Sequence, residues 1–105
     1  MSFENKQIDE IYALYQSKNP DYIWIDVRQP EEWDTGTIPG IEKIMLSELD
    51  AHLDQLPQDK TYIMVCRSGM RSARACEAMA DVGFKSLVNF EGGMLAWHEA
   101  GYPTD

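Results

Sequence analysis

A chain of 105 residues is long enough for one small domain and too short for two, and its 44% hydrophobic and 26% charged residues are typical of a globular protein. Its 18 Asp and Glu outnumber its 9 Lys and Arg, and the resulting net charge of -9 disfavours nucleic acid and anionic membranes as partners. We therefore expect residues 1–105 to form a single domain that binds neither nucleic acid nor a membrane.

The N-terminal sequence MSFENKQIDE lacks the positive run and the apolar run of a signal peptide. No apolar stretch elsewhere approaches the ~20 residues that a membrane helix needs. These features predict a cytoplasmic protein. The two cysteines, Cys66 and Cys76, are then expected to be free thiols and not a disulfide.

The N-terminal half of the chain predicts a helix, a strand, a helical turn and a second, short strand. Apolar side chains recur at helical spacing over about residues 6–17. Residues 22–27 are apolar and β-branched, which favours a strand buried on both faces of a parallel sheet. Pro30 opens a helical turn that Gly36 ends, and residues 41–45 are expected to form a short edge strand.

The C-terminal half repeats the alternation of helices and strands. We expect helices over residues 47–56, 72–82 and 94–100, and strands over residues 61–66 and 86–89. This alternation predicts an α/β fold with a parallel sheet and right-handed crossovers. In such sheets ligands bind beyond the carboxyl ends of the strands, so residues that follow a strand are candidates for a site.

One stretch, VCRSGMRSARAC at residues 65–76, contains both cysteines, three of the four arginines and no acidic residue. Cys66 ends a predicted strand, and Gly69 permits the positive φ of a tight curl that turns backbone N–H groups inward around an anion. The dipole of the following helix adds positive potential, and Arg67 and Arg71 supply forked donors that match oxyanions. The candidate site residues are Cys66, Arg67, Ser68, Gly69, Met70, Arg71 and Ser72.

The same surroundings act on the sulfur of Cys66. A cysteine at the end of a strand is commonly a small buried hydrophobic residue. A helix N-terminus and nearby arginines, however, lower the pKa of a thiol and increase the fraction of nucleophilic thiolate. We therefore predict a reactive thiolate at Cys66. Cys76 lies on the apolar face of a predicted helix and is assigned to packing, and Arg74 is assigned to the surface.

Other polar residues near the predicted strand ends have structural interpretations. Asp26 and Arg28 lie at the same edge of the predicted sheet as Cys66, where they could orient the loop. We favour a structural role, with Arg28 paired to Glu32 one turn into the next helix. His52 and His98 share no ligand spacing with the cysteines, so we expect no metal site.

Three motifs in this sequence resemble the rhodanese family of sulfurtransferases: DVRQPEEWDTGTIPG, CRSGMRSA and FEGGMLAWHEAGYP, which together span residues 26–103. The resemblance implies a rhodanese-like fold, a five-stranded parallel sheet flanked by helices on both faces. It also implies that Cys66 takes a sulfane sulfur from a donor such as thiosulfate, forms a persulfide and passes the sulfur to cyanide or a thiol. No metal or organic cofactor is implied. Thr37 stands where the family often has histidine.

The sequence leaves more than one function open. In the first interpretation the chain is a thiosulfate sulfurtransferase, in which Arg67 and Arg71 hold the anionic donor and the backbone of residues 68–72 forms the cradle. In the second it is a persulfide carrier or redox-regulatory module that serves a partner protein, such as a protein sulfur acceptor. The third is a phosphatase or arsenate reductase. In the rhodanese-like enzymes of that type, five residues separate the cysteine of the loop from the arginine. In this chain only four residues separate Cys66 from Arg71.

Overall fold

The computed structural model describes residues 2–105 and contains one sheet of five parallel strands in the order β1-β5-β4-β2-β3. The strands are β1 (Glu4–Lys6), β2 (Tyr22–Asp26), β3 (Glu42–Lys43), β4 (Thr61–Val65) and β5 (Leu87–Phe90). The predicted α/β fold with a five-stranded parallel sheet is therefore confirmed. The central strand, β4, ends immediately before Cys66.

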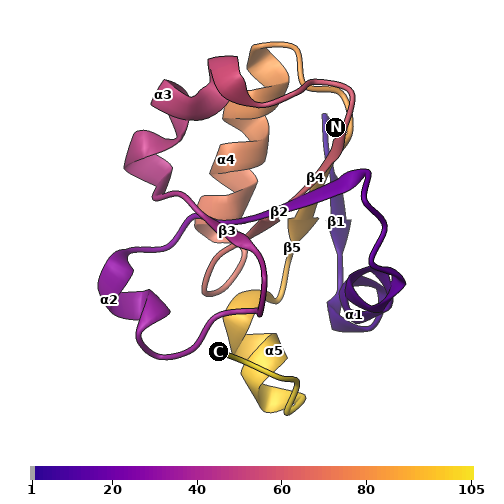
Figure 1. The fold of residues 1–105 in the computed structure, drawn as a ribbon, viewed down its shortest axis with the longest axis vertical. Helices are drawn as coiled ribbons and strands as arrows, with labels where there is room; N and C mark the ends of the chain where they lie inside the picture. The colour runs from indigo at the N-terminus through magenta and orange to yellow at the C-terminus, as the bar shows by residue number, and fades with distance from the viewer. Residues whose placement is uncertain (1) are drawn as a thin grey trace.

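Helices cover both faces of the sheet (Figure 1). They are α1 (Ile8–Ser17), α2 (Pro30–Trp33), α3 (Leu49–His52), α4 (Met70–Asp81) and α5 (Gly93–Glu99), and the short 3-10 turns η1 (Leu46–Glu48) and η2 (Leu53–Gln55) flank α3. The side chains of α3 and α4 pack on one face, and those of α1 and α5 pack on the other. Of the helices within residues 2–105, none has the length and apolar character that a membrane crossing requires.

The alternating side chains of β4 join two separate clusters of buried residues. Tyr62 and Met64 point into the cluster that contains Cys76 of α4, whereas Ile63 and Val65 point into the cluster around α1 and α5. All four of these β4 side chains are 0% exposed. A strand buried on both faces needs no alternation of apolar and polar residues, which explains its continuous apolar sequence. The buried centre of the sheet therefore holds the start of the cysteine loop.

Several element boundaries differ from the sequence prediction. Helix α4 begins at Met70 and not at Ser72, so the connection after β4 is shorter than expected. The helix predicted over residues 47–56 is divided among η1, α3 and η2. Strand β1 was not predicted from its residues, because it is short and polar and is held by its pairing with β5. The polar residues of β1 gave no apolar pattern to detect.

Candidate active site

The backbone of Cys66 is fixed at the carboxyl end of β4 by the start of α5. The carbonyl oxygen of Cys66 accepts the N–H of Met94 at 2.8 Å, and that of Arg67 accepts the N–H of Leu95 at 3.1 Å. Gly93 has a φ of +59°, and a Cβ atom there would overlap the Arg67 carbonyl oxygen. A glycine at position 93, the first residue of α5, is therefore required for the close contact between this helix and the cysteine loop.

The loop then turns sharply at Gly69. Its φ is +90°, and a Cβ atom there would overlap the carbonyl oxygen of Glu91. In this conformation the N–H of Gly69 donates to the Sγ of Cys66 at 3.1 Å. Met70 and Arg71 already belong to the first turn of α4, whose N–H groups have no acceptor within the helix. The loop therefore surrounds the sulfur with backbone donors.

A buried chain of polar side chains extends from the sulfur to β1. The Oγ of Ser72 lies 3.2 Å from the Sγ of Cys66 and donates to the Oδ1 of Asn89 at 2.5 Å. The Nδ2 of Asn89 donates to the carbonyl oxygen of Gly69 at 3.1 Å and to the Oδ1 of Asn5 at 2.9 Å. Ser72 is 0% exposed and Asn89 is 2% exposed. Asn5 and Asn89 are not among the site residues that the sequence predicts, although an asparagine within an otherwise apolar strand is a signal that indicates Asn89.

The two cysteines have opposite environments. Burial alone would raise the pKa of Cys66, but hydrogen bonds from the Ser72 hydroxyl and from the backbone N–H groups of Ser72, Ser68 and Gly69 outweigh burial and lower this pKa below its ordinary value of 9.0. Cys76 is 0% exposed within the apolar cluster, and burial raises its pKa to about 12. The expected packing role of Cys76 agrees with this environment, whereas Cys66 has the environment of a reactive thiol.

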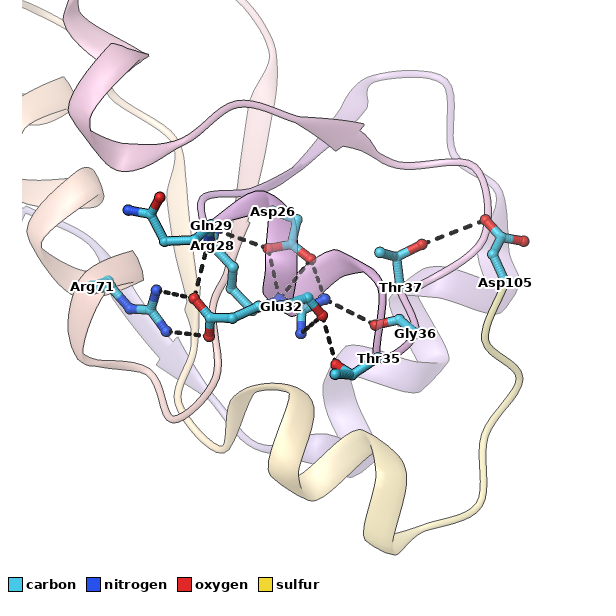
Figure 2. A network of polar contacts seen from close by, with 9 residues as sticks. All are labelled: Asp26, Arg28, Gln29, Glu32, Thr35, Gly36, Thr37, Arg71 and Asp105. Atoms are coloured by element: carbon cyan, nitrogen blue, oxygen red, sulfur yellow. Dashed lines mark hydrogen bonds and ion pairs between the residues drawn. The ribbon is translucent and has the colours of Figure 1, made fainter.

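Two of the four arginines are engaged in ion pairs near α2 (Figure 2). Arg71 donates to both carboxylate oxygens of Glu32, at 2.6 and 2.8 Å. Arg28 is buried and donates to the carboxylate of Asp26 at 2.8 to 3.0 Å and to the carbonyl oxygens of Glu32 and Gly36. Arg28 therefore has a structural environment, as expected, but its carboxylate partner is Asp26. The carboxylate of Glu32 binds Arg71 instead.

The other predicted residues lie on the rim of the loop. Arg67 and Ser68 are exposed, and Met70 is 69% exposed. Arg67 lines a cavity of about 200 Å³, together with Glu32 of α2 and His98 of α5. Cys66 is 1% exposed and does not line this cavity. Of the predicted site residues, the structure thus brings the backbone of Ser68 and Gly69 and the side chain of Ser72 to the sulfur, and it places Arg67 at the neighbouring cavity.

Thr37, at the position where the family often has histidine, is buried beneath the C-terminal residues. Its carbonyl oxygen accepts the N–H of Asp105 at 2.9 Å, and its hydroxyl donates to the carboxylate of Asp105 at 3.5 Å (Figure 2). Thr37 is 2% exposed. Within residues 2–105, the His, Cys, Asp and Glu side chains form no group of three that could hold a metal ion.

The fold and the site place the chain among α/β proteins that carry a cysteine loop at the carboxyl end of the central strand of a parallel sheet. Comparison with known families identifies which of these proteins it resembles. The family model described as "Rhodanese-like domain" matches residues 7–100. The chain therefore belongs to the rhodanese-like family, as the sequence motifs predicted.

The curated relatives have names that refer to sulfur chemistry. "Putative sulfurtransferase YtwF" of Bacillus subtilis is 45% identical over 73 residues, which cover 70% of each chain. "Probable adenylyltransferase/sulfurtransferase MoeZ" of Mycobacterium tuberculosis is 43% identical over 75 residues, and "Putative sulfur carrier protein YrkF" of B. subtilis is 36% identical over 73 residues. Each of these two matches covers 70% of this chain, but only 19% of MoeZ and 40% of YrkF. Together they support sulfur transfer as the general chemistry of the family to which this chain belongs.

Solved structures agree on the fold. A rhodanese-related protein from Thermoplasma volcanium is 33% identical, with a TM-score of 0.84 and 97% of both chains covered. A protein from Rhodopseudomonas palustris, described as a "Possible Tyrosine Phosphatase", is also 33% identical, with a TM-score of 0.91, and the match covers 99% of this chain and 86% of that one.

Proposed function

We propose that the chain is a sulfurtransferase that moves a sulfane sulfur from an anionic donor such as thiosulfate to cyanide or a thiol, through a persulfide on Cys66. The observation that carries this proposal is the position of the Cys66 sulfur within the loop, where it accepts the Gly69 N–H at 3.1 Å. The loop lies at the carboxyl end of a parallel strand, where α/β proteins bind their ligands.

The chemistry balances without a metal, an organic cofactor or an external oxidant. The Cys66 thiolate attacks the outer sulfur of thiosulfate, so that a Cys–S–S⁻ persulfide forms as the donor S–S bond breaks and sulfite leaves with the bonding electrons. Cyanide or a thiolate then attacks the outer sulfur of the persulfide, and the Cys66 thiolate returns. Backbone N–H groups directed at the sulfur stabilise the negative charge in both steps.

Donor binding is assigned to the loop and to its neighbouring cavity. The backbone of residues 68–72 forms the anion cradle, with the exposed Ser68 and Met70 at its rim. Arg67 lines the adjacent cavity of about 200 Å³ and attracts the anion. Arg71 contributes from the first turn of α4, where Glu32 orients its guanidinium group.

The direct test is the mass of the intact protein after incubation with thiosulfate, followed by cyanide. We expect a gain of about 32 Da, the mass of one sulfur atom, that cyanide removes as thiocyanate. The Cys66→Ser variant should show no gain, whereas the Cys76→Ser variant should load normally. If the wild-type protein gained no sulfur from thiosulfate, the proposed reaction would be wrong.

A second candidate, a persulfide carrier for a partner protein, is favoured by the name of the relative YrkF, a "Putative sulfur carrier protein". A carrier uses the same thiolate, and it differs in the rate of release. Loaded protein that keeps its sulfur in the presence of cyanide or small thiols, but transfers it to a protein thiol, would support the carrier.

A phosphatase or arsenate reductase is the third candidate, and the R. palustris protein described as a "Possible Tyrosine Phosphatase" is the observation in its favour. Only four residues separate Cys66 from Arg71, whereas five separate the cysteine from the arginine in the enzymes of that type. Hydrolysis of an aryl phosphate that is lost in Cys66→Ser would support this candidate over sulfur transfer.

A further inference from the structure

The hydroxyl group of Ser72 contacts two groups that compete for its proton. Its Oγ lies 3.2 Å from the Sγ of Cys66 and 2.5 Å from the Oδ1 of Asn89. A serine hydroxyl carries one proton and can donate a full hydrogen bond to one acceptor at a time. The partner that receives this proton determines how Ser72 acts on the sulfur.

The orientation of the Asn89 amide is fixed by its other partners. The Nδ2 of Asn89 lies 3.1 Å from the carbonyl oxygen of Gly69, which can only accept a hydrogen bond. Exchanging the amide nitrogen and oxygen would place two acceptors against each other. The Oδ1 of Asn89 therefore faces Ser72, and because an amide oxygen cannot donate, the Ser72 proton points toward Asn89.

We propose that Asn89 is a positioning residue that controls the protonation of Cys66 by competing for the Ser72 hydroxyl proton. In the thiol state, the Cys66 S–H donates to the Oγ of Ser72, which donates to Asn89. When the thiol loses its proton to solvent, the hydroxyl rotates about the Cβ–Oγ bond and donates to the thiolate. The buried Oδ1 of Asn89 then loses its donor, which makes the thiolate less favourable.

The persulfide state restores the first arrangement, a consequence that rests on the proposed function. In a persulfide, the negative charge is on the outer sulfur, and the Sγ of Cys66 is bonded on both sides and uncharged. The Ser72 hydroxyl then returns to Asn89. Asn89 thus favours both the thiol and the sulfur-loaded form over the empty thiolate.

Charged side chains on the cysteine loop and on the elements beside it remain in place when Asn89 is changed. They are the exposed Arg67, the Arg71–Glu32 pair and the buried Arg28–Asp26 pair. The side-chain hydrogen bonds of Asn89 within residues 2–105 go to Ser72, Gly69 and Asn5 and to none of these charges. A change in the pKa of Cys66 in an Asn89 variant therefore reports on the hydrogen bonds that Asn89 makes to Ser72 and to the loop at Gly69.

The test is the pKa of Cys66, measured from the ultraviolet absorbance of the thiolate as a function of pH, with the Cys66→Ser protein subtracted. In Asn89→Ala we expect the pKa to fall by about half to one unit, a roughly three- to tenfold gain in the ratio of thiolate to thiol. Asn89→Leu keeps most of the side-chain volume and carries the same test if the alanine variant does not fold. No sulfur donor is present, so the result does not depend on the proposed sulfur transfer.

Two further variants separate a positioning role from general loosening of the loop. The effect of Asn89→Ala should disappear in a Ser72→Ala background, because the competition requires the hydroxyl. Asn5→Ala removes the Oδ1 atom that accepts a hydrogen bond from the Nδ2 of Asn89, and it should leave the pKa of Cys66 unchanged. A rise or no change in this pKa in Asn89→Ala, or an equal fall without Ser72, would overturn the proposal.

Discussion

The ion pair between Glu32 and Arg71 should make the free energy of unfolding of the protein depend on pH. Glu32 accepts two hydrogen bonds from Arg71 and one from the backbone N–H of Gln29, and it lies across from the first turn of α4. The hydrogen bonds from Arg71 are the main reason that the pKa of Glu32 is lowered from 4.5 to about 2. Glu32→Gln removes the charge and keeps an oxygen that can accept from Gln29.

The size of the effect follows from this pKa and from the exposure of the pair. The difference between a pKa of 4.5 and one of about 2 corresponds to an upper limit of about 3 kcal/mol. The side chains of Arg71 and Glu32 are 32% and 25% exposed, so solvent screens the pair, and we expect Glu32→Gln to cost about 1 kcal/mol at pH 7. Because the folded pKa is below the unfolded value, this stability is present above pH 4.5 and is lost as the pH falls toward 2.

The assay is urea unfolding of the wild-type and Glu32→Gln proteins between pH 7 and pH 3. The difference between their free energies of unfolding should be constant above about pH 5.5 and shrink steadily below pH 4.5. Glu31→Gln is the matched control, since Glu31 forms no ion pair within residues 2–105 and its loss should change stability little. A difference that persists undiminished at pH 3, or that is absent at pH 7, would refute the assignment to the ion pair.

Three further predictions concern the cysteine loop. At pH 7 iodoacetamide should alkylate Cys66 and leave Cys76 unmodified in the folded protein, because burial raises the pKa of Cys76 to about 12. Peptide mass spectrometry identifies the alkylated cysteine, and alkylation of Cys76 in preference to Cys66 would contradict this prediction. Arg67→Met should raise the KM for thiosulfate about three- to tenfold with little change in kcat, as steady-state kinetics can measure, and an unchanged KM would exclude Arg67 from donor binding. Gly69→Ala should lower the free energy of unfolding by about 2 kcal/mol or more, because a Cβ atom would overlap the Glu91 carbonyl oxygen, and unaltered urea unfolding would contradict the required curl.

The parts of the fold that depend on local patterns were predictable from the sequence. The continuous apolar residues of β2 and β4 indicated buried parallel strands, and the helical spacing in α1 and α4 indicated amphipathic helices. Strand β1 and the division of the residue 47–56 helix were not predictable in this way. Those features depend on pairing and packing with residues far away in the chain, which no local window contains.

The candidate site shows the same division. Cys66 and Gly69 could be identified because a strand end, a glycine and a helix start follow one another in the sequence. Asn89 could not be assigned a role, because its contact with Ser72 joins residues 17 positions apart, and the link to Asn5 spans 84 positions. Polar groups that satisfy one another inside a core require the three-dimensional arrangement to be recognised.

The number of arginines near Cys66 in the sequence does not by itself indicate which groups stabilise its thiolate. The sequence places three arginines within residues 65–76, but Glu32 neutralises Arg71, and Arg67 has no ion-pair partner within residues 2–105. The pKa of Cys66 is lowered by hydrogen bonds from the Ser72 hydroxyl and from the backbone N–H groups of Ser72, Ser68 and Gly69, whose positions are fixed by the curl at Gly69 and by the start of α4. Fixed dipoles at contact distance are screened by salt much less than an exposed arginine is. Raising the ionic strength should therefore weaken the attraction of the donor to Arg67 while leaving the pKa of Cys66 nearly unchanged.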